Sequence, residues 1–285
     1  MASFTNQATL RYNGLTVNSN VVTGQMISPL SMTKTPVEDE YAPGDTLSYV
    51  ISLVNDGSVN YENLTLTDDL GGYAVSGGQT AWPLAYVADS LRYFINGVPQ
   101  PAPAVTPGPP LSVTGVSVPA GGNAMLVYET EVTAAAPLTE GGSITNTAAV
   151  SGAGLTNPLE AEASVGVSSG AELSILKSLS PATVPENGQL SYTFLIQNHG
   201  NQAADQAAGV TVSDLFDPVL KNLSVSLNGQ PLAQGSGYSY NQSSGQFDTV
   251  PGLITVPAAS YAQTASTGDW IVSPGESTLS VSGTV

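Results

Sequence analysis

An internal repeat constrains the fold of this chain more than any other feature of its sequence. The segment Leu30–Thr35, with the sequence LSMTKT, matches Leu173–Ser178, with the sequence LSILKS, and a proline-containing turn follows each copy. Leu47–Gly57 likewise matches Leu190–Gly200. With 285 residues, the chain is long enough for each copy to bury a core of its own. The repeat therefore indicates two homologous domains.

Both copies alternate apolar and polar residues, are rich in Thr, Val, Tyr and Ile, and are interrupted by Asn-Gly and Pro-Gly turns. Such alternation is typical of antiparallel strands joined by tight turns, and regularly spaced short strands favour a sandwich. We therefore expect an all-β fold with two tandem immunoglobulin-like β-sandwich domains. Three further matches extend the repeat: Leu64–Asp68 with Val210–Asp214, Phe94–Pro99 with Ser226–Pro231, and Val118–Gly121 with Val272–Gly275.

The two copies differ in how they end. The first continues into a strand at Ser143–Val150 and a return strand through Ala163–Val167, whereas the second has no such hairpin before Val285. At the other end of the chain, Ser3–Leu10 matches Ser143–Val150 at Ser, Thr, Asn and Ala. We expect an N-terminal donor β-hairpin at 1–24, a linker at 25–29, a complete repeat at 30–168, a linker at 169–171 and an incomplete repeat at 172–285. Alternatively, residues 1–24 are the remnant of a cropped repeat array.

A sandwich without its closing strands exposes an apolar groove and an unpaired edge, and an isolated hairpin is marginal in water. If the hairpin of one copy inserted into the second repeat of the next copy, it would cover the groove, pair with the open edge and stabilise the hairpin. The short linker at 169–171 opposes closure within one chain, and a contact that does not close produces an open filament. The sequence thus predicts a self-assembling structural subunit, with a donor interface formed by Phe4, Ala8, Leu10, Tyr12 and Val21.

Three pairs of equivalent residues carry the one predicted chemistry. Lys34 and Lys177 are equivalent in the repeat, as are Asp68 and Asp214 at a strand end, and Asn146 and Asn6 in the closing hairpins. Lys, Asn and a carboxyl group on neighbouring strands are the components of an isopeptide bond: a desolvated, neutral Lys attacks the Asn amide while the acid moves protons. We expect Lys34–Asn146 within the first repeat and Lys177–Asn6 between copies. Alternatively, the lysines form surface ion pairs and the asparagines make turn hydrogen bonds.

The motifs LSMTKT, PGDTLSY, LTD and ITNTA together resemble the conserved surface-repeat domain known as domain of unknown function eleven. The resemblance covers nearly the whole chain, except that the second repeat lacks ITNTA and the N-terminal segment supplies its counterpart. Members of this family are immunoglobulin-like modules of large bacterial and archaeal surface proteins. The resemblance implies a structural or adhesive role and no enzymatic activity.

The composition excludes several functional classes. The net charge of −17 opposes binding to nucleic acids and to anionic membranes, and the absence of cysteine excludes disulfides. We expect no cofactor, no metal and no external substrate, and a location outside the cell on a cell or spore surface. The sequence shows no signal peptide, so the export route stays open. The alternative function is a monomeric or stalk-like adhesin that binds through loops at 71–89 or 233–268.

Overall fold

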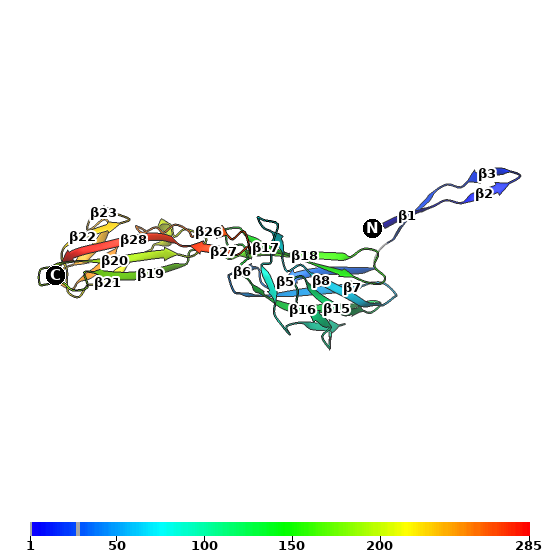
Figure 1. The fold of residues 1–285 in the computed structure, drawn as a ribbon, viewed down its shortest axis with the longest axis horizontal. Coiled ribbons are helices and arrows are strands. Elements are labelled where there is room, and N and C mark those ends of the chain that lie inside the picture. The colour runs from blue at the N-terminus through cyan, green and yellow to red at the C-terminus, as the bar shows by residue number, and fades with distance from the viewer. Residues whose placement is uncertain (1, 27–28) are drawn as a thin grey trace. The chain divides into compact units, whose positions relative to one another are not determined.

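The computed structural model describes residues 2–26 and 29–285 and consists almost entirely of β-strands (Figure 1). In this part of the chain the one helical element is the short 3-10 helix η1 (Gln206–Ala208), and no helix is long and apolar enough to cross a membrane. The chain divides into two compact units. Unit 1 comprises 1–73, 82–133 and 144–165, and unit 2 comprises 74–81, 134–143 and 166–285.

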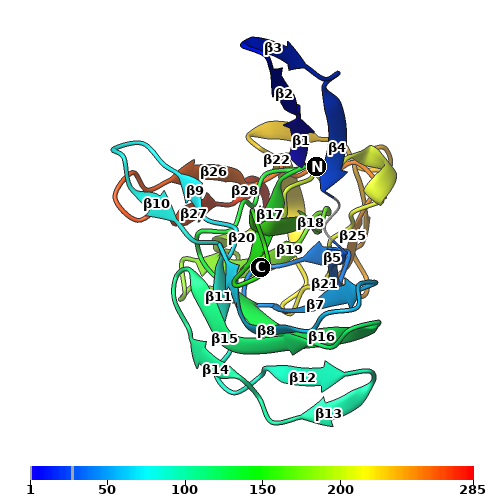
Figure 2. The ribbon, with the colours of Figure 1, turned by 90° about the vertical axis from the view of Figure 1, so that its right-hand side faces the viewer.

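Unit 1 contains two six-stranded sheets. The first has the order β13-β12-β16-β7-β5, with β11 also pairing with β16, and the second has the order β14-β15-β8-β17-β18-β6. Figure 2 shows β5, β7 and β16 side by side. The strands of the first sheet are β5 (Leu30–Pro36), β7 (Thr46–Asn55), β11 (Leu84–Tyr86), β12 (Arg92–Ile95), β13 (Val98–Gln100) and β16 (Gly122–Val132). Those of the second are β6 (Glu40–Tyr41), β8 (Tyr61–Asp68), β14 (Ala104–Thr106), β15 (Leu111–Val118), β17 (Ser143–Ser151) and β18 (Leu159–Val167).

Alternation along the strands builds the core, as predicted. In β7, Leu47, Tyr49, Ile51 and Leu53 are buried, and the residues between them are more exposed. The Asn96-Gly97 turn joins β12 to β13 with positive φ at both residues, which is the geometry that two-residue hairpins require. The all-β expectation is therefore confirmed.

Unit 2 has a five-stranded sheet of order β19-β20-β28-β22-β23, a three-stranded sheet of order β21-β25-β24 and a two-stranded sheet of β26 and β27. Its core gathers Tyr192, Phe194, Phe216, Phe247 and Leu279. Its strands are β19 (Leu173–Ser180), β20 (Gln189–Asn198), β21 (Ser213–Leu215), β22 (Lys221–Leu227), β23 (Gln230–Leu232), β24 (Tyr238–Asn241), β25 (Gln246–Thr249), β26 (Ser260–Gln263), β27 (Trp270–Ser273) and β28 (Gly275–Thr284).

The strand registers show that the repeat is structural. Lys34 pairs with Ile51 across β5 and β7, and Lys177 pairs with Phe194 across β19 and β20, and each lysine is the fifth residue of its strand. Gly122 lies opposite Asn55, and Gly275 lies opposite Asn198. These pairs define which residues of the two units correspond.

One predicted match, of Val118–Gly121 with Val272–Gly275, is wrong. The Asn55 side chain donates to the carbonyl of Pro119 at 3.0 Å, and the Asn198 side chain donates to that of Pro257 at 3.0 Å. Pro257 is therefore the counterpart of Pro119, and residues 258–274 are an insertion that forms the β26–β27 hairpin. The Pro-Gly pair at the end of this insertion resembles the turn of the first repeat in sequence, which is why the two segments were matched.

The predicted repeat at 30–168 is not continuous in space, because residues 74–81 and 134–143 belong to unit 2. There the Trp270 N–H donates to the Ala134 carbonyl at 2.8 Å. The segments predicted as adhesive loops also contain strands. The 71–89 segment includes β9 (Tyr73–Ala74), β10 (Thr80–Ala81) and β11, and the 233–268 segment includes β24, β25 and β26.

The N-terminal hairpin forms, but as two short ladders instead of one long strand. β1 (Ala2–Asn6) pairs with β4 (Val22–Met26), and β2 (Thr9–Tyr12) pairs with β3 (Leu15–Asn18). Between them, the Ala8 N–H donates to the Ser19 hydroxyl at 2.9 Å, so a side chain replaces part of the ladder. Every side chain from Ser3 to Thr23 is exposed. Met1 and residues 27 and 28 of the predicted linker at 25–29 lie outside the described residues.

Candidate isopeptide site and open groove

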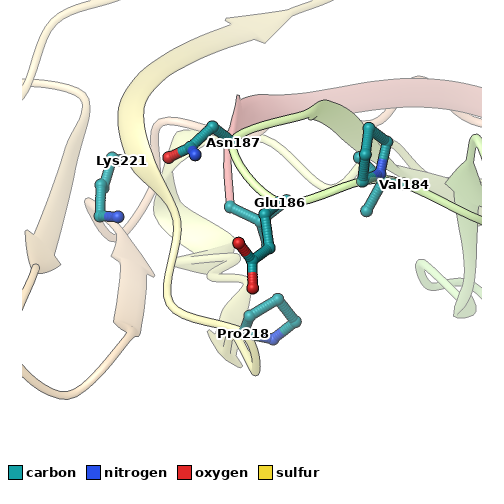
Figure 3. A pocket seen from close by; sticks show the side chains of 7 residues that line it. Val184, Glu186, Asn187, Pro218 and Lys221 are labelled. Atoms are coloured by element: carbon teal, nitrogen blue, oxygen red, sulfur yellow. The ribbon is translucent and has the colours of Figure 1, made fainter.

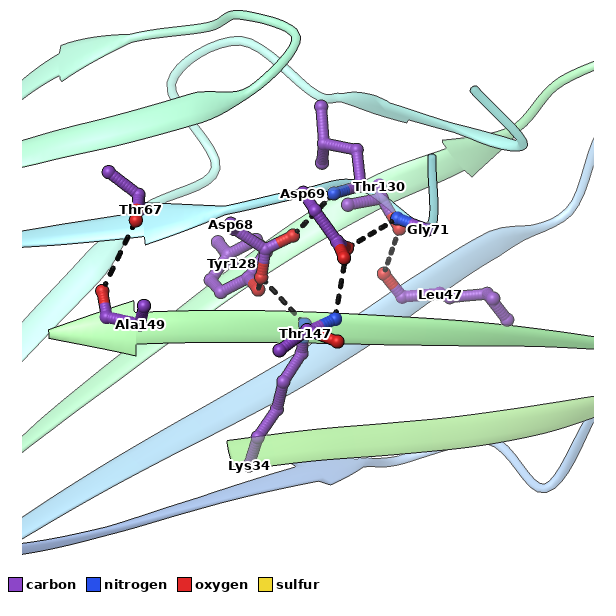
Figure 4. A network of polar contacts seen from close by, with 11 residues as sticks. Lys34, Leu47, Thr67, Asp68, Asp69, Gly71, Tyr128, Thr130, Thr147 and Ala149 are labelled. Carbon is purple, nitrogen blue, oxygen red and sulfur yellow. Dashed lines mark hydrogen bonds and ion pairs between the residues drawn. The ribbon is translucent and has the colours of Figure 1, made fainter. Parts of the chain in front are cut away.

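A buried lysine marks the centre of unit 1. The Lys34 side chain leaves β5 and reaches across the sandwich to Asp68 at the end of β8, with Nζ 2.6 Å from Oδ2 (Figure 4). Both side chains are completely buried. Asp68 also accepts hydrogen bonds from the Tyr128 hydroxyl and from the Leu70 N–H. Burial lowers the pKa of Lys34 below its usual value, although the neighbouring Asp68 partly opposes this.

Asn146 completes the predicted triad on the neighbouring strand. It lies on β17, which pairs with β8 so that Ala148 is opposite Asp68. Its side chain is fully buried, and within the described part of the chain neither its amide nitrogen nor its amide oxygen has a hydrogen-bond partner. Buried amides are nearly always paired, because an unpaired polar group costs about 1–3 kcal/mol. The unpaired state of Asn146 therefore requires an explanation.

Tyr49 connects the lysine and the asparagine. Its ring centroid lies 4.8 Å from the Lys34 Nζ, and its hydroxyl lies beside the Asn146 amide. Burial raises the pKa of Tyr49, and the nearby Asn146 lowers it by a smaller amount. The Tyr49 hydroxyl nonetheless has no well-formed hydrogen bond among the described residues, so we interpret its relation to Asn146 as proximity only. Lys34, Asp68 and Asn146 thus share one buried site.

Two tyrosines that the sequence prediction omitted enclose this site. The rings of Tyr49 and Tyr128 stack with centroids 5.9 Å apart. Burial and the Asp68 charge raise the pKa of Tyr128 well above its usual value, so its hydroxyl stays protonated and donates to Asp68. A sequence signal for Tyr49 existed, because Tyr192 repeats it at the same inward position. Tyr128 has no such signal, since its counterpart is Val281.

The equivalent lysine of unit 2 has the same carboxylate partner but is open to solvent. Lys177 forms an ion pair with Asp214, yet 42% of the Lys177 side chain and 16% of the Asp214 side chain are exposed. The lysine Nζ lies 4.5 Å from the ring centroid of Tyr192 and 5.6 Å from that of Phe216. Unit 2 therefore has a lysine, an acid and an aromatic lining without an asparagine beside them.

The exposure of Lys177 belongs to a longer open groove. Leu173, Ile175 and Leu179 share its face of β19 and are all exposed. In unit 1 the strand β8 pairs with β15 on one side and β17 on the other, whereas β21 pairs only with β25 among the described strands. β21 covers three residues instead of the eight of β8, so of the predicted match Val210–Asp214 only Ser213 and Asp214 are in a strand.

The N-terminal hairpin has residues of similar type at the positions that are buried in β17. Phe4, Asn6, Ala8 and Leu10 occupy the positions of Ile144, Asn146, Ala148 and Val150, which are the buried positions of β17. All four hairpin residues are exposed, as is Tyr12 further along the same alternation. Val21 is exposed too but precedes β4, and Val22 is the residue that lies opposite Asn6.

The structure thus assembles one predicted set of residues and not the other. It pairs Lys34 with Asp68 and places Asn146 beside Tyr49, whose ring contacts Lys34. It pairs Lys177 with Asp214 and leaves Asn6 exposed on the hairpin.

No protein-family model matches the sequence, and no curated protein matches it. Among solved structures, similarity extends to the major pilin subunit BcpA of Bacillus cereus, with 12% identity and a TM-score of 0.36 over 96% of this chain and 73% of that one. The pilus backbone RrgB of Streptococcus pneumoniae shows 12% identity and a TM-score of 0.35 over 86% of this chain, which spans 55% of that protein. The collagen-binding domain of a Staphylococcus aureus adhesin shows 13% identity and a TM-score of 0.30, over 50% of this chain and 99% of that domain. At such values we draw neither fold nor function from these similarities.

Proposed function

We propose that this chain is the structural subunit of an extracellular filament that assembles head to tail by donor-strand complementation. Residues 1–24 of one copy complete the sandwich at 172–285 of the next copy. One observation carries the proposal: the positions that β17 and β18 fill in unit 1 are open in unit 2, and the exposed hairpin repeats the inward residues of β17. The resemblance to surface-repeat domains supports the same role.

Unit 1 supplies the register of the proposed joint. Ala148 lies opposite Asp68 and Val150 lies opposite Leu66. The equivalent pairing places Ala8 opposite Asp214 on β21 and Leu10 opposite Val212, just before that strand. Burying Phe4, Leu10 and Val22 would contribute roughly 1.5–3 kcal/mol for each side chain, in addition to the backbone ladder.

We further propose that unit 1 contains an isopeptide bond between Lys34 and Asn146. Transfer of the Lys34 proton to Asp68 produces a neutral amine and a neutral acid, which burial favours over two charges. The amine Nζ attacks the Asn146 amide carbon, Asp68 gives its proton to the departing amide nitrogen, and the C–N bond breaks to release ammonia. The Asp68 carboxylate then takes the proton that Nζ loses as it becomes an amide. The unpaired amide of Asn146 is the atom group that this reaction consumes.

The same chemistry would join neighbouring copies. Asn6 occupies the position of Asn146, and Lys177 with Asp214 occupies the position of Lys34 with Asp68. Insertion of the hairpin would bring the Asn6 amide to Lys177 and bury both. The proposed filament is thus held by strand pairing first and by covalent bonds afterwards. We propose no reaction on an external substrate.

Electron microscopy and size measurement of the purified protein test assembly. Full-length protein should form filaments, and a chain without residues 1–24 should stay monomeric because it lacks the donor. This truncated chain should still fold, since the side chains described from Ser3 to Thr23 are exposed and lie outside both cores. Boiling filaments in detergent should leave a ladder of covalent multimers that Lys177→Ala abolishes. Full-length protein that stays monomeric at high concentration would overturn the proposal and favour a monomeric surface adhesin.

A further inference from the structure

A pocket of about 470 Å³ opens in unit 2 between the 184–187 turn, the loop after β21 and Val285 (Figure 3). Val184 and Val285 contribute apolar surface, Pro218 lines it from the loop after β21, and Glu186 and Lys221 bring charged groups to it. At the corresponding position of unit 1, larger side chains fill this space, as a comparison of the two turns shows.

The two units form the same turn at this point. In unit 2 the Val285 N–H donates to the Gly188 carbonyl at 3.1 Å, and in unit 1 the Val132 N–H donates to the Asp45 carbonyl at 2.8 Å. Four residues before these carbonyls stand Val184 and Tyr41. Tyr41 is completely buried on β6, which pairs with β18 of the closing hairpin, whereas Val184 is half-buried and lines the pocket. A tyrosine ring is therefore replaced by a valine.

The first inward residue of the closing hairpin lies in this region of unit 1. Ile144 contacts the loop that follows Asp68, since a Cβ built on Gly71 would lie 2.8 Å from its Cγ2 atom. The corresponding loop of unit 2 follows Asp214 and carries Pro218 into the pocket. The hairpin residue in the position of Ile144 is Phe4.

A second residue changes size in the same direction. Two contacts fix the register of β17 against β18. The Val167 N–H donates to the Gly142 carbonyl, and the Thr145 and Ser164 hydroxyls are 2.9 Å apart. In this antiparallel register Ile144 lies opposite Val165. In the N-terminal hairpin Phe4 lies opposite Gly24, and a Cβ on Gly24 would lie 2.3 Å from the Phe4 ring. Compared with the closing hairpin of unit 1, the N-terminal hairpin therefore has phenylalanine in place of isoleucine and glycine in place of the opposite valine.

From these correlated changes we infer that the pocket is the binding site for the Phe4 side chain of a second copy. Space for the larger donor residue comes from Val184 in place of Tyr41 and from Gly24 in place of Val165. The pocket therefore selects the N-terminal hairpin over a hairpin with the β17 sequence, which carries isoleucine at this position. This inference rests on the proposed donor-strand assembly and adds its anchor residue and its specificity.

Exchanging the residues between the two units tests the inference. The full-length chain should carry Asn6→Ala, so that assembly stays reversible, and the critical concentration for filament formation should be measured by sedimentation. Val184→Tyr fills the pocket, and Phe4→Ile removes part of the anchor. Burial of one large apolar side chain corresponds to about 10- to 100-fold in association. Val184→Tyr excludes the whole Phe4 side chain and should raise the critical concentration by at least about 10-fold, whereas Phe4→Ile keeps part of the anchor and should raise it by less. The double variant restores the Tyr–Ile combination of unit 1 and should return close to the parent.

Val59→Tyr provides the matched control, because it adds the same ring at a strongly exposed position of unit 1. Thermal unfolding of the monomeric variants checks that Val184→Tyr still folds. If Val184→Tyr assembles like the control, or if the double variant is no better than the singles, the pocket does not receive Phe4, although filaments and the proposed function stand. If wild-type protein forms no filaments at all, both proposals fail.

Discussion

Replacing Asn146 with alanine should destabilise unit 1 strongly, although the side chain removed is small and polar. In the proposed mature protein Asn146 is bonded to Lys34, and the variant loses this crosslink. Without the crosslink, the same substitution would remove an amide that is buried and unpaired. That removal would relieve a cost of about 1–3 kcal/mol, offset in part by a small cavity. The two chemical states of Asn146 therefore predict different outcomes for one substitution.

The expected magnitude follows from the loop that the bond closes. Residues 34 and 146 enclose roughly 110 residues, and the loop-entropy relation for crosslinks gives about 5 kcal/mol for a loop of this length. For a unit of this size, 5 kcal/mol corresponds to a decrease in Tm of about 10–20 °C. An effect near zero or a slight stabilisation is expected if no bond forms.

Intact mass and differential scanning calorimetry together provide the assay. The wild-type chain should be lighter than its sequence by one ammonia for the bond in unit 1, and Asn146→Ala should have the full mass of its sequence. Asn123→Ala is a suitable control, since Asn123 is exposed on β16 in the same unit. A wild-type mass equal to that of the sequence, with Tm unchanged or raised in Asn146→Ala, would refute the isopeptide in unit 1.

Three further predictions concern the reactivity of the lysines, the pKa of Lys34 and the hydrogen bond from Tyr128 to Asp68. In subunits without the hairpin, an amine-acylating reagent should modify Lys177 and Lys221 but not Lys34, and Lys34 should stay unmodified even in denaturant, where a free amine would react; modification of Lys34 there would show that it carries no bond. In Asn146→Ala, Lys34 keeps its amine and burial lowers its pKa; if the folded unit releases this proton to solvent and not to Asp68, the unfolded chain binds more protons, so the free energy of unfolding should rise as the pH approaches the usual lysine pKa of 10.5, by at most about 1.4 kcal/mol per pH unit; a flat profile in urea titrations would contradict release of the proton to solvent. Tyr128→Phe removes a donor to Asp68 and should cost about 1–3 kcal/mol in unfolding free energy and slow the loss of ammonia followed by mass spectrometry, whereas Tyr12→Phe, at an exposed position, should change neither.

Much of the fold could be predicted because the repeat compares the chain with itself. The equivalences of Lys34 with Lys177 and of Asn55 with Asn198 need no outside reference, and the strand registers confirm them. The turn before the last strand of the second repeat was matched wrongly, because Pro274-Gly275 resembles the Pro119-Ala120-Gly121 turn while the true counterpart, Pro257, lies before an insertion. Local sequence identifies a turn type, but only the side-chain hydrogen bonds of the conserved asparagine identify which turn is equivalent.

The reactive residues of the candidate site could be predicted from the sequence, but the residues that surround them could not. Lys34, Asp68 and Asn146 were identified because each has an equivalent elsewhere in the chain and because alternation directs Lys34 inward. The contribution of Tyr128 depends on the sheet order, which places β16 beside β7, and no short sequence motif specifies that order. The break at Gln7 and Ala8 was also unpredictable, since it depends on a hydroxyl eleven residues away, that of Ser19.

The difference in exposure between the two lysines has a consequence for the order of events in the proposed assembly. Lys34 is buried as unit 1 folds, because β17 belongs to the same chain, whereas Lys177 stays exposed and paired with Asp214. The proposed reaction needs a desolvated amine beside an amide, so Lys177 should react only after the hairpin both removes water and delivers Asn6. A hairpin inserted one residue out of register would turn Asn6 to the opposite face and leave Lys177 unreacted. Such a joint keeps only its non-covalent contacts and can dissociate, so the covalent bond forms selectively at joints whose register is correct.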